Sequence, residues 1–249
     1  MSSFDEKVAL VSGGSSGIGE AAAVALRRAG AKVFGAASGE ASRAAAEARH
    51  PDIDWIVCDV RSRASIDAAV DAVLRSAGRL DVLVNNAGIY GFAPLEAARE
   101  ELVRSHFEVN VFGLTFLTQA ALPALKSSRG SIVNVSSAAA QRALAGNSIN
   151  AATKAAVDSL TRSWAVELAA HGIRVNAVAP GPTTTPGVAK LPIPAEMRAV
   201  VVEALLKKIP LGRSGASEEV ARWIVALADP SASWLTGQVL AIDGGMSVG

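Results

Sequence analysis

The regular alternation of short apolar segments with longer helical ones constrains the fold of this chain more than any other feature. The apolar segments, such as Lys7–Ser12 and Ser131–Val135, are continuous β-type runs rather than alternations of apolar and polar residues. Such runs are typical of parallel strands that are covered on both faces of a sheet. Parallel neighbours need crossover connections, which are right-handed. The pattern therefore predicts an α/β fold, a doubly wound parallel sheet of about seven strands with helices on both faces.

The predicted elements follow one another without a domain linker. Strands are expected at 7–12, 32–36, 53–58, 81–85, 131–135, 173–179 and 238–242. Helices are expected at 19–29, 40–49, 62–76, 97–121 with a break near Gly113, 149–170 and 223–228. The irregular region from Gly181 to about Gly215 holds five of the ten prolines and a helical candidate at 195–208. An insertion after the carboxyl end of a strand is where a substrate lid would lie. We therefore expect a single domain over residues 1–249, with a lid at about 182–215.

Charge and composition exclude several classes of partner and site. The 24 basic and 23 acidic residues leave a net charge of +1, so neither nucleic acid nor an anionic membrane is expected as the main partner. The single cysteine, Cys58, rules out an internal disulfide and favours a reducing compartment. The sequence shows neither a signal-peptide pattern nor an apolar run of about 18 residues, which predicts a cytoplasmic protein. His50, His106 and His171 lack ligand spacing, so no metal site is expected.

The glycine-rich segment SGGSSGIG, residues 12–19, joins the first predicted strand to the first predicted helix. A diphosphate needs backbone N–H groups at a helix N-terminus and no Cβ atoms in the way. Glycines at this place supply the tight turn and the close approach. The segment therefore predicts a dinucleotide site, although its spacing is G-x3-G-x-G. The residues expected to bind the cofactor here are Gly13, Ser15, Ser16, Gly17, Ile18 and Gly19.

Further motifs follow in a characteristic order. They are Asp59-Val60, Asn85-Asn86-Ala87-Gly88, Asn110 in FEVN, Ser136-Ser137, Lys154, Pro180-Gly181 and the C-terminal LTGQVLAIDGG. Together with the glycine turn, in which Ser12 replaces the usual Thr, they resemble the classical type of the short-chain dehydrogenase/reductase family. The resemblance covers essentially the whole chain and implies a Rossmann-like fold. It also implies cofactor contacts from Asp59, Val60, Asn86, Ala87, Gly88, Lys154, Pro180, Gly181, Thr183 and Thr185.

The identity of the cofactor depends on the end of the second predicted strand. An acidic residue about 20 positions after the turn would pair with a ribose 2′-hydroxyl and favour NAD. Here the chain reads Ala37-Ser38-Gly39, without Asp or Glu, and the Arg that is usual for NADP is missing because Ser16 fills its place in the turn. Ser38, Ser42 and Arg43 could together hold a 2′-phosphate. These residues favour NADP(H) slightly over NAD(H).

The catalytic residues implied by the resemblance are Asn110, Ser137, Lys154 and a tyrosine four residues before the lysine. In the family the serine orients the carbonyl, the tyrosine donates the proton, and the lysine lowers the pKa of the tyrosine and binds the ribose. Four residues before Lys154, and 13 after Ser137, the chain has Asn150. A carboxamide donates a hydrogen bond but has no ionisable proton near pH 7. Loss of a positioned acid costs on the order of 10² to 10⁴ in rate.

Three explanations of Asn150 remain open. The chain is an inactivated variant that traps a ligand, a natural member with altered or non-redox chemistry, or an enzyme in which another donor acts by way of water. Tyr90 is the one tyrosine in the chain and so the alternative phenol for proton donation, but we interpret it as a wall of the substrate pocket beside Ser137 and Asn150. His106 shares a predicted helix face with Asn110 and is a weaker pocket candidate. A GxSxG elbow is missing, which excludes a serine hydrolase.

The function predicted from these residues is NAD(P)-dependent hydride transfer between a ketone and a secondary alcohol, with proton transfer impaired or altered at Asn150. The alternative is a non-redox protein on the same fold, either a cofactor-binding sensor or partner protein, or an enzyme of the cyclase or isomerase type. The lid residues Val188, Leu191, Ile193, Met197, Val201 and Leu205 indicate an apolar small-molecule substrate. The resemblance implies a homotetramer, or a homodimer, through the helices at 97–121 and 149–170 and the last strand.

Overall fold

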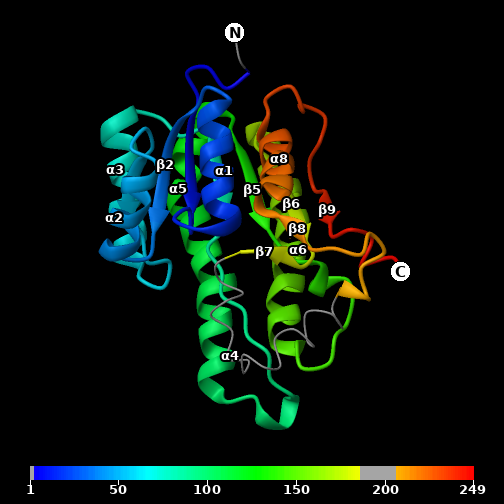
Figure 1. Ribbon diagram of the computed structural model, residues 1–249. Coiled ribbons are helices and arrows are strands. Elements are labelled where there is room, and N and C mark those ends of the chain that lie inside the picture. Colours follow the sequence, from blue (N-terminus) through cyan, green and yellow to red (C-terminus); the bar gives the residue numbers. More distant parts are fainter. Residues whose placement is uncertain (1–2, 186–205) are drawn as a thin grey trace.

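A computed structural model describes residues 3–185 and 206–249. Seven parallel strands form one sheet in the order β3-β2-β1-β4-β5-β6-β9 (Figure 1). The strands are β1 (Val8–Ser12), β2 (Lys32–Ala37), β3 (Asp54–Val57), β4 (Val82–Asn85), β5 (Ser131–Val135), β6 (Arg174–Pro180) and β9 (Val239–Ile242). The helices that cover the sheet are α1 (Gly17–Arg28), α2 (Glu40–Arg49), α3 (Arg63–Ala77), α5 (Leu114–Ser128), α6 (Ser148–Leu168) and α8 (Ser217–Ala228). The predicted doubly wound fold is confirmed.

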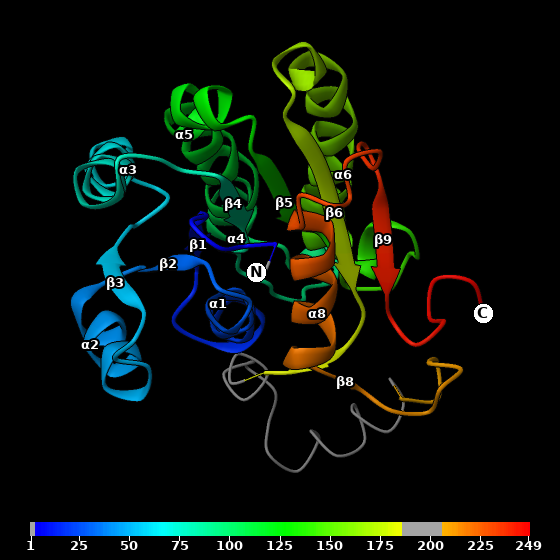
Figure 2. The ribbon, with the colours of Figure 1, turned by 90° about the horizontal axis from the view of Figure 1, so that it is seen from above.

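Helices lie on both faces of the sheet, as Figure 2 shows from above. Along β1, Ala9 and Val11 point into the core that α1, α2 and α8 close, whereas Val8 and Leu10 point into the core that α3, α5 and α6 close. Successive side chains of a strand alternate between faces, so every residue of β1 is buried. This double burial explains why the strands are continuous apolar runs in the sequence. None of the described helices is long and apolar enough to cross a membrane.

The strand order reverses between β1 and β4. The chain runs outward from β1 through β2 to β3 and then returns to the other side of β1 to form β4. The connections that leave β1 and β4 in opposite directions open a crevice at the carboxyl ends of these strands, which is where ligands bind in sheets of this kind. The glycine turn and the segments after β4, β5 and β6 all meet at this edge.

The predicted helix at 97–121 is a composite of several segments. It consists of a short 3-10 turn, Leu95–Ala97, then α4 (Glu100–Phe107), a π-helical segment Glu108–Gly113, and α5. The expected break near Gly113 is a widening of the helix, and a Cβ at Gly113 would lie 2.8 Å from the Cβ of Val60. Single π-helical turns often mark functional sites. The helix also continues through Pro123 to Ser128, beyond its predicted end.

The last helix is longer than predicted, and most of the predicted lid lies outside the described residues. The last helix, predicted to contain residues 223–228, begins at Ser217, where Glu219 accepts a hydrogen bond from the Ala216 N–H and so stabilises the N-terminus. The apolar lid residues and most of the helical candidate at 195–208 lie outside the described residues. The flanks of that segment pair as two short parallel strands, β7 (Thr183–Thr184) and β8 (Gly215–Ala216).

Gly35 shows how closely the sheet is packed. It lies opposite Trp55 in the register of β2 and β3, and a Cβ at Gly35 would lie 2.3 Å from Cζ3 of the Trp55 ring. The indole is fixed, since its Nε1 donates a hydrogen bond of 2.9 Å to the His50 carbonyl. The small residue is therefore required by its cross-strand neighbour.

We expect Gly35→Ala to lower the free energy of unfolding by about 1–3 kcal/mol because the methyl group overpacks against the indole. Chemical denaturation followed by circular dichroism measures this change. Gly39→Ala is the control for added side-chain volume, since a Cβ there would meet no atom within 4 Å; because Gly39 is the N-cap of α2, a loss of no more than about 1 kcal/mol is expected. In a Trp55→Leu background the cost of Gly35→Ala should shrink; an unchanged cost would contradict this explanation.

Candidate functional site

The glycine turn packs directly on the segment that follows β4. Gly13 has a φ of +60°, and a Cβ on it would lie 2.8 Å from the Cα of Ala87. A Cβ on Gly19 would lie 2.3 Å from the Asn86 Nδ2. That Nδ2 donates hydrogen bonds of 3.0 Å to the carbonyls of Ser12 and Gly13. The segment after β4 therefore leaves no space for a side chain at Gly13 or Gly19. The hydrogen bonds of Asn86 hold the turn against that segment.

Ser12 joins the same two segments through its hydroxyl. Its Oγ donates to the Val84 carbonyl and accepts hydrogen bonds of 3.1 Å from the N–H groups of Asn86 and Ala87. A serine hydroxyl supplies all of these bonds, so the usual threonine methyl group is not needed for them.

The first turn of α1 is open to an anion. Gly17, with a φ of +57°, begins the helix, and the N-cap residue Ser16 makes no side-chain capping bond. The N–H groups of a helix N-terminus carry partial positive charge and bind phosphate groups. Thr185, which follows β7, lies beside the turn, since a Cβ on Gly17 would be 3.2 Å from its Cβ. The donors and the glycine backbone fit a dinucleotide diphosphate.

Arg49 holds the glycine turn through a hydrogen bond to its backbone, a contact that the sequence does not predict. Its Nη2 donates a hydrogen bond of 2.8 Å to the Ser15 carbonyl, and its Nε donates one of 2.7 Å to Glu20. His50 lies 3.0 Å from the same Glu20 oxygen. No sequence motif signals this bridge, because it joins the end of α2 to a turn 34 residues earlier.

The expected adenosine side of the site contains two fixed charges. Asp59 accepts hydrogen bonds of 2.7–3.2 Å from the Arg61 guanidinium, and these bonds lower the pKa of the carboxyl group. Arg43 lies between Glu40 and Glu47, at 2.7 and 2.8 Å. Its charge is therefore already balanced by two carboxylates. Ser42 donates its hydroxyl to the Gly39 carbonyl, whereas Ser38 is exposed.

Asn110 connects the segment after β4 to α6 from within the π-helical turn. Its side chain exchanges two hydrogen bonds of 2.9 Å with the backbone of Ile89 and donates a third, of 3.0 Å, to the Thr153 hydroxyl. The Thr153 hydroxyl in turn donates to the Asn150 carbonyl. The amide of Asn110 therefore fixes the relative position of the β4 loop and of the turn of α6 that carries Asn150 and Lys154.

Lys154 lies partly buried between β5 and the β4 loop. Its Nζ donates a hydrogen bond of 2.8 Å to the Val135 carbonyl, and a Cβ on Gly88 would be 3.5 Å from that Nζ. Burial lowers the pKa of Lys154 to about 8, although the carboxylate of Asp158 acts in the opposite direction.

Ser136 and Asp158 form a pair behind Lys154. The Ser136 hydroxyl donates to Asp158 and also contacts the Lys154 carbonyl. Burial raises the pKa of Asp158, and the hydrogen bond from Ser136 opposes this effect. The pair therefore places one acidic group close to the lysine on the helix.

Asn150 lies one helical turn before Lys154 on the same face of α6. Its side chain is 6% exposed, and its Oδ1 has no hydrogen-bond partner among the described residues. A buried acceptor left without a donor costs about 1–3 kcal/mol. Ser137, at the end of β5, accepts a hydrogen bond of 3.1 Å from the Ala139 N–H through its Oγ. The amide of Asn150 thus has an unused acceptor that suits a donor from a ligand or from water.

Tyr90 and His106 serve other contacts. The Tyr90 hydroxyl is hydrogen-bonded to Thr185, its ring is 40% exposed, and burial raises its pKa further above neutrality. His106 is buried with its Nδ1 2.7 Å from the Leu102 carbonyl, and its ring lies against Gly91. In the part of the chain that the structure describes, no cluster of three metal-ligating side chains occurs.

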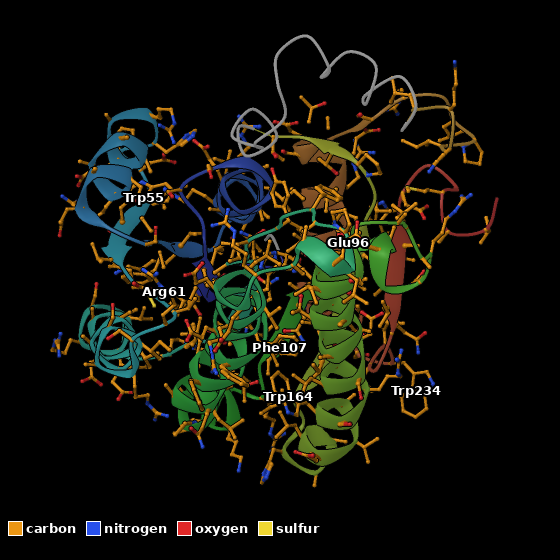
Figure 3. The ribbon with its side chains drawn as sticks, turned by 90° about the horizontal axis from the view of Figure 1, so that it is seen from below. Trp55, Arg61, Glu96, Phe107, Trp164 and Trp234 are labelled. Carbon is orange, nitrogen blue, oxygen red and sulfur yellow. The ribbon has the colours of Figure 1, made fainter. Side chains whose placement is uncertain are left out.

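Four large aromatic side chains lie apart from this cluster. Figure 3 shows Phe107 and Trp164 in the layer between the helical column of α4 and α5 and helix α6. Trp55 lies at the edge of the sheet near β3, and Trp234 lies beyond the opposite edge, fully exposed. The polar groups around Lys154 come from the segments after β4 and β5, from the π-helical segment and from α6.

Comparisons with known proteins agree with this arrangement. A family model described as Enoyl-(Acyl carrier protein) reductase matches residues 13–247. The 3-oxoacyl-(acyl-carrier-protein) reductase FabG of Thermotoga maritima is 42% identical over 98% of this chain and 99% of its own length. The cis-4-hydroxycyclohexanecarboxylate dehydrogenase of Sinomonas cyclohexanicum is 41% identical over 97% of both chains.

Solved structures of reductases are also similar to this chain over nearly its whole length. The 3-ketoacyl-(acyl-carrier-protein) reductase from Brucella melitensis, complexed with NADH, superposes with a TM-score of 0.90 at 32% identity and covers 98% of this chain and 99% of its own. Levodione reductase superposes with a TM-score of 0.90 at 33% identity over 98% of each chain. The sheet order, the glycine turn and these similarities together establish that the chain belongs to the short-chain dehydrogenase/reductase family.

Proposed function

We propose that the protein is an NAD(P)-dependent oxidoreductase that interconverts a ketone and a secondary alcohol, with proton transfer altered by Asn150. The observation that carries this proposal is the arrangement of Asn150 and Lys154. They share one face of α6 at the edge of the sheet that holds the glycine turn, and the buried Asn150 Oδ1 lacks a partner among the described residues. The similar reductases and dehydrogenases favour redox chemistry over the sensor and isomerase alternatives.

The described residues divide the binding of the cofactor among them. The glycine turn and the N–H groups of α1 would hold the diphosphate, Asp59 and Val60 the adenine, and Lys154 the ribose. Pro180, Gly181, Thr183 and Thr185 would meet the carboxamide. When bound, the nicotinamide supplies or accepts the hydride.

Around the reacting carbonyl the chain offers hydrogen-bond donors but no phenol. The Ser137 hydroxyl and the Asn150 amide can both donate to the carbonyl oxygen and so orient it. Neither group can release a proton near pH 7. The developing alkoxide is therefore stabilised by hydrogen bonds while its proton comes from another group, which makes proton transfer the slow step.

Cofactor preference follows from the end of β2. Neither Ala37 nor Ser38 carries a carboxylate that would repel a 2′-phosphate at the end of β2. Ser38, Ser42 and Arg43 could contact such a phosphate and so favour NADP(H). Since Glu40 and Glu47 already balance the charge of Arg43, the gain from a phosphate is small. We therefore propose a slight preference for NADP(H) with retained use of NAD(H).

The expected substrate, assembly and location belong to the same proposal. The apolar lid residues favour an apolar ketone or alcohol. Phe112 and Phe116 on the helical column and Val166 on α6 are exposed apolar side chains on the two long helices, as a homotetramer or homodimer interface requires. The thiol of Cys58 suits a cytoplasmic, reducing setting.

Restoring the phenol tests the function. We expect Asn150→Tyr to raise kcat for reduction of a panel of cyclic ketones and 3-oxoacyl thioesters by on the order of 10² to 10⁴, because a positioned acid then protonates the alkoxide. Asn150→Phe is the matched control, since it fills the same volume without the hydroxyl, and it should give no gain. Absorbance of the reduced nicotinamide at its characteristic band follows the reaction. If Asn150→Tyr binds cofactor but turns over no member of the panel, the non-redox alternative is correct.

The cofactor preference is tested by fluorescence titration with NADPH and NADH. The wild-type protein should bind NADPH more tightly by about two- to fivefold, the range expected of one exposed ion pair. Arg43→Ala should weaken NADPH binding by that factor and leave NADH binding unchanged. Arg75→Ala, an exposed arginine near the end of α3, should change neither. Tighter binding of NADH by the wild-type protein would contradict the preference.

A further inference from the structure

We propose that Lys154 is the proton source in this protein, and that its ammonium group protonates the substrate alkoxide through a water molecule held by the Asn150 amide. The inference rests on the proposed redox function and deepens it by naming the acid. It assigns to the lysine itself the proton that Asn150 cannot supply.

The first support is the unused acceptor of Asn150. Its Oδ1 is buried and has no hydrogen-bond partner among the described residues, so it suits a hydrogen from water. A bound water needs two to four polar partners. The Asn150 Oδ1, the Lys154 ammonium and the substrate oxygen provide three.

The second support is the position of the lysine. Asn150 and Lys154 are one turn apart on one face of α6, and the Lys154 Nζ gives one hydrogen to the Val135 carbonyl. An ammonium group has three donors, so two remain for the water and the ribose. Gly88 lies against Nζ without a side chain.

The other candidate acids are committed elsewhere. The Tyr90 hydroxyl is bonded to Thr185, and its ring is 40% exposed. The His106 Nδ1 is bonded to the Leu102 carbonyl, and its buried Nε2, which has no partner among the described residues, faces Gly91 rather than Asn150. Asp158 is held by the Ser136 hydroxyl.

The pKa of Lys154 is suitable for a general acid. Burial brings its pKa to about 8, near the working pH of a general acid. Asp158, on the same helix, is the charged group that opposes this shift. The residues that lie against the ammonium from the other elements, Val135 and Gly88, carry no charge.

The proposed step is balanced. In reduction, the carbonyl carbon accepts a hydride from NAD(P)H, the π electron pair moves to oxygen, and NAD(P)⁺ is formed. The oxygen takes a proton from the water, which takes one from Lys154. The neutral amine is then reprotonated by solvent. Reduction therefore slows as the pH rises through about 8, whereas oxidation, which needs the neutral amine, speeds up.

The first test needs no turnover. A lysine whose pKa falls on folding destabilises the folded state below its folded pKa, and this cost disappears as the pH rises toward the unfolded value. Between pH 7 and 9.5 the unfolding constant of the wild-type protein should fall by about thirtyfold relative to that of Lys154→Met. Lys126→Met, an exposed lysine on α5, should show no such change relative to wild type. A Lys154 contribution that does not vary over this range would overturn the proposal.

The second test is the pH profile of ketone reduction. The wild-type protein should lose activity above an apparent pKa near 8, and Lys154→Met should lose on the order of 10² or more in kcat. Added ethylamine should restore part of that loss. Lys154→Arg keeps the charge and the donors but cannot release a proton near neutral pH, so it should also be slow. A Lys154→Arg variant with the wild-type rate and profile would overturn the proposal, since charge and binding alone would then suffice.

The outcomes separate the two proposals. If the wild-type protein and Asn150→Tyr both reduce ketones, but the wild-type rate and stability show no titration of Lys154 near pH 8, the redox function stands and the role of Lys154 as acid is wrong. If neither reduces any ketone of the panel, the redox function fails, and the role of Lys154 fails with it.

Discussion

The site depends on the contact between the glycine turn and the segment after β4. There is no space for a side chain at Gly13 or Gly19, because Ala87 and Asn86 already occupy it. The hydrogen bonds of Asn86 and Ser12 hold the two segments together at the point where the strand order reverses. This contact leaves the N–H groups of α1 open at the crevice and sets the β4 loop, through Asn110, against the Asn150 turn of α6. The phosphate site and the candidate catalytic cluster therefore share one frame.

Much of this frame was predictable from the sequence. Doubly buried parallel strands must be continuous apolar runs, so Val8–Ser12 and Ser131–Val135 identified the sheet. The Gly113 region was harder, because a π-helical turn has no periodicity of its own, and the contact with Val60 that requires a glycine joins distant parts of the chain. The hydrogen bonds from Arg49 to Ser15 and from Ser136 to Asp158 could not be predicted either, because they also join residues that are distant in the sequence. The ion pairs of Arg43 could be guessed from the i,i+3 and i,i+4 spacing of Glu40 and Glu47, but their effect on cofactor choice required the geometry.

The hydrogen bonds that hold the α6 turn in place do not depend on which side chain stands at position 150. Thr153, Asn110 and Ile89 hold the backbone of this turn through hydrogen bonds that do not involve the Asn150 side chain. In the proposed mechanism, a change of the side chain at position 150 would alter the proton supply and the space around the substrate, while these supporting contacts persist. Lys154 keeps its own contact with Val135, and its environment lowers its pKa without any phenol beside it. The fold thus retains cofactor binding independently of the rate of proton transfer.

In the proposed mechanism, proton transfer rather than hydride transfer limits the rate of the wild-type protein. Isotope effects on kcat for reduction of the best ketone test this most directly, with solvent deuterium and cofactor deuterium varied separately. We expect a large solvent isotope effect and a small cofactor isotope effect for the wild-type protein, with the order reversed in Asn150→Tyr. A wild-type protein with a large cofactor effect and no solvent effect would contradict it, because the proton would then arrive without delay.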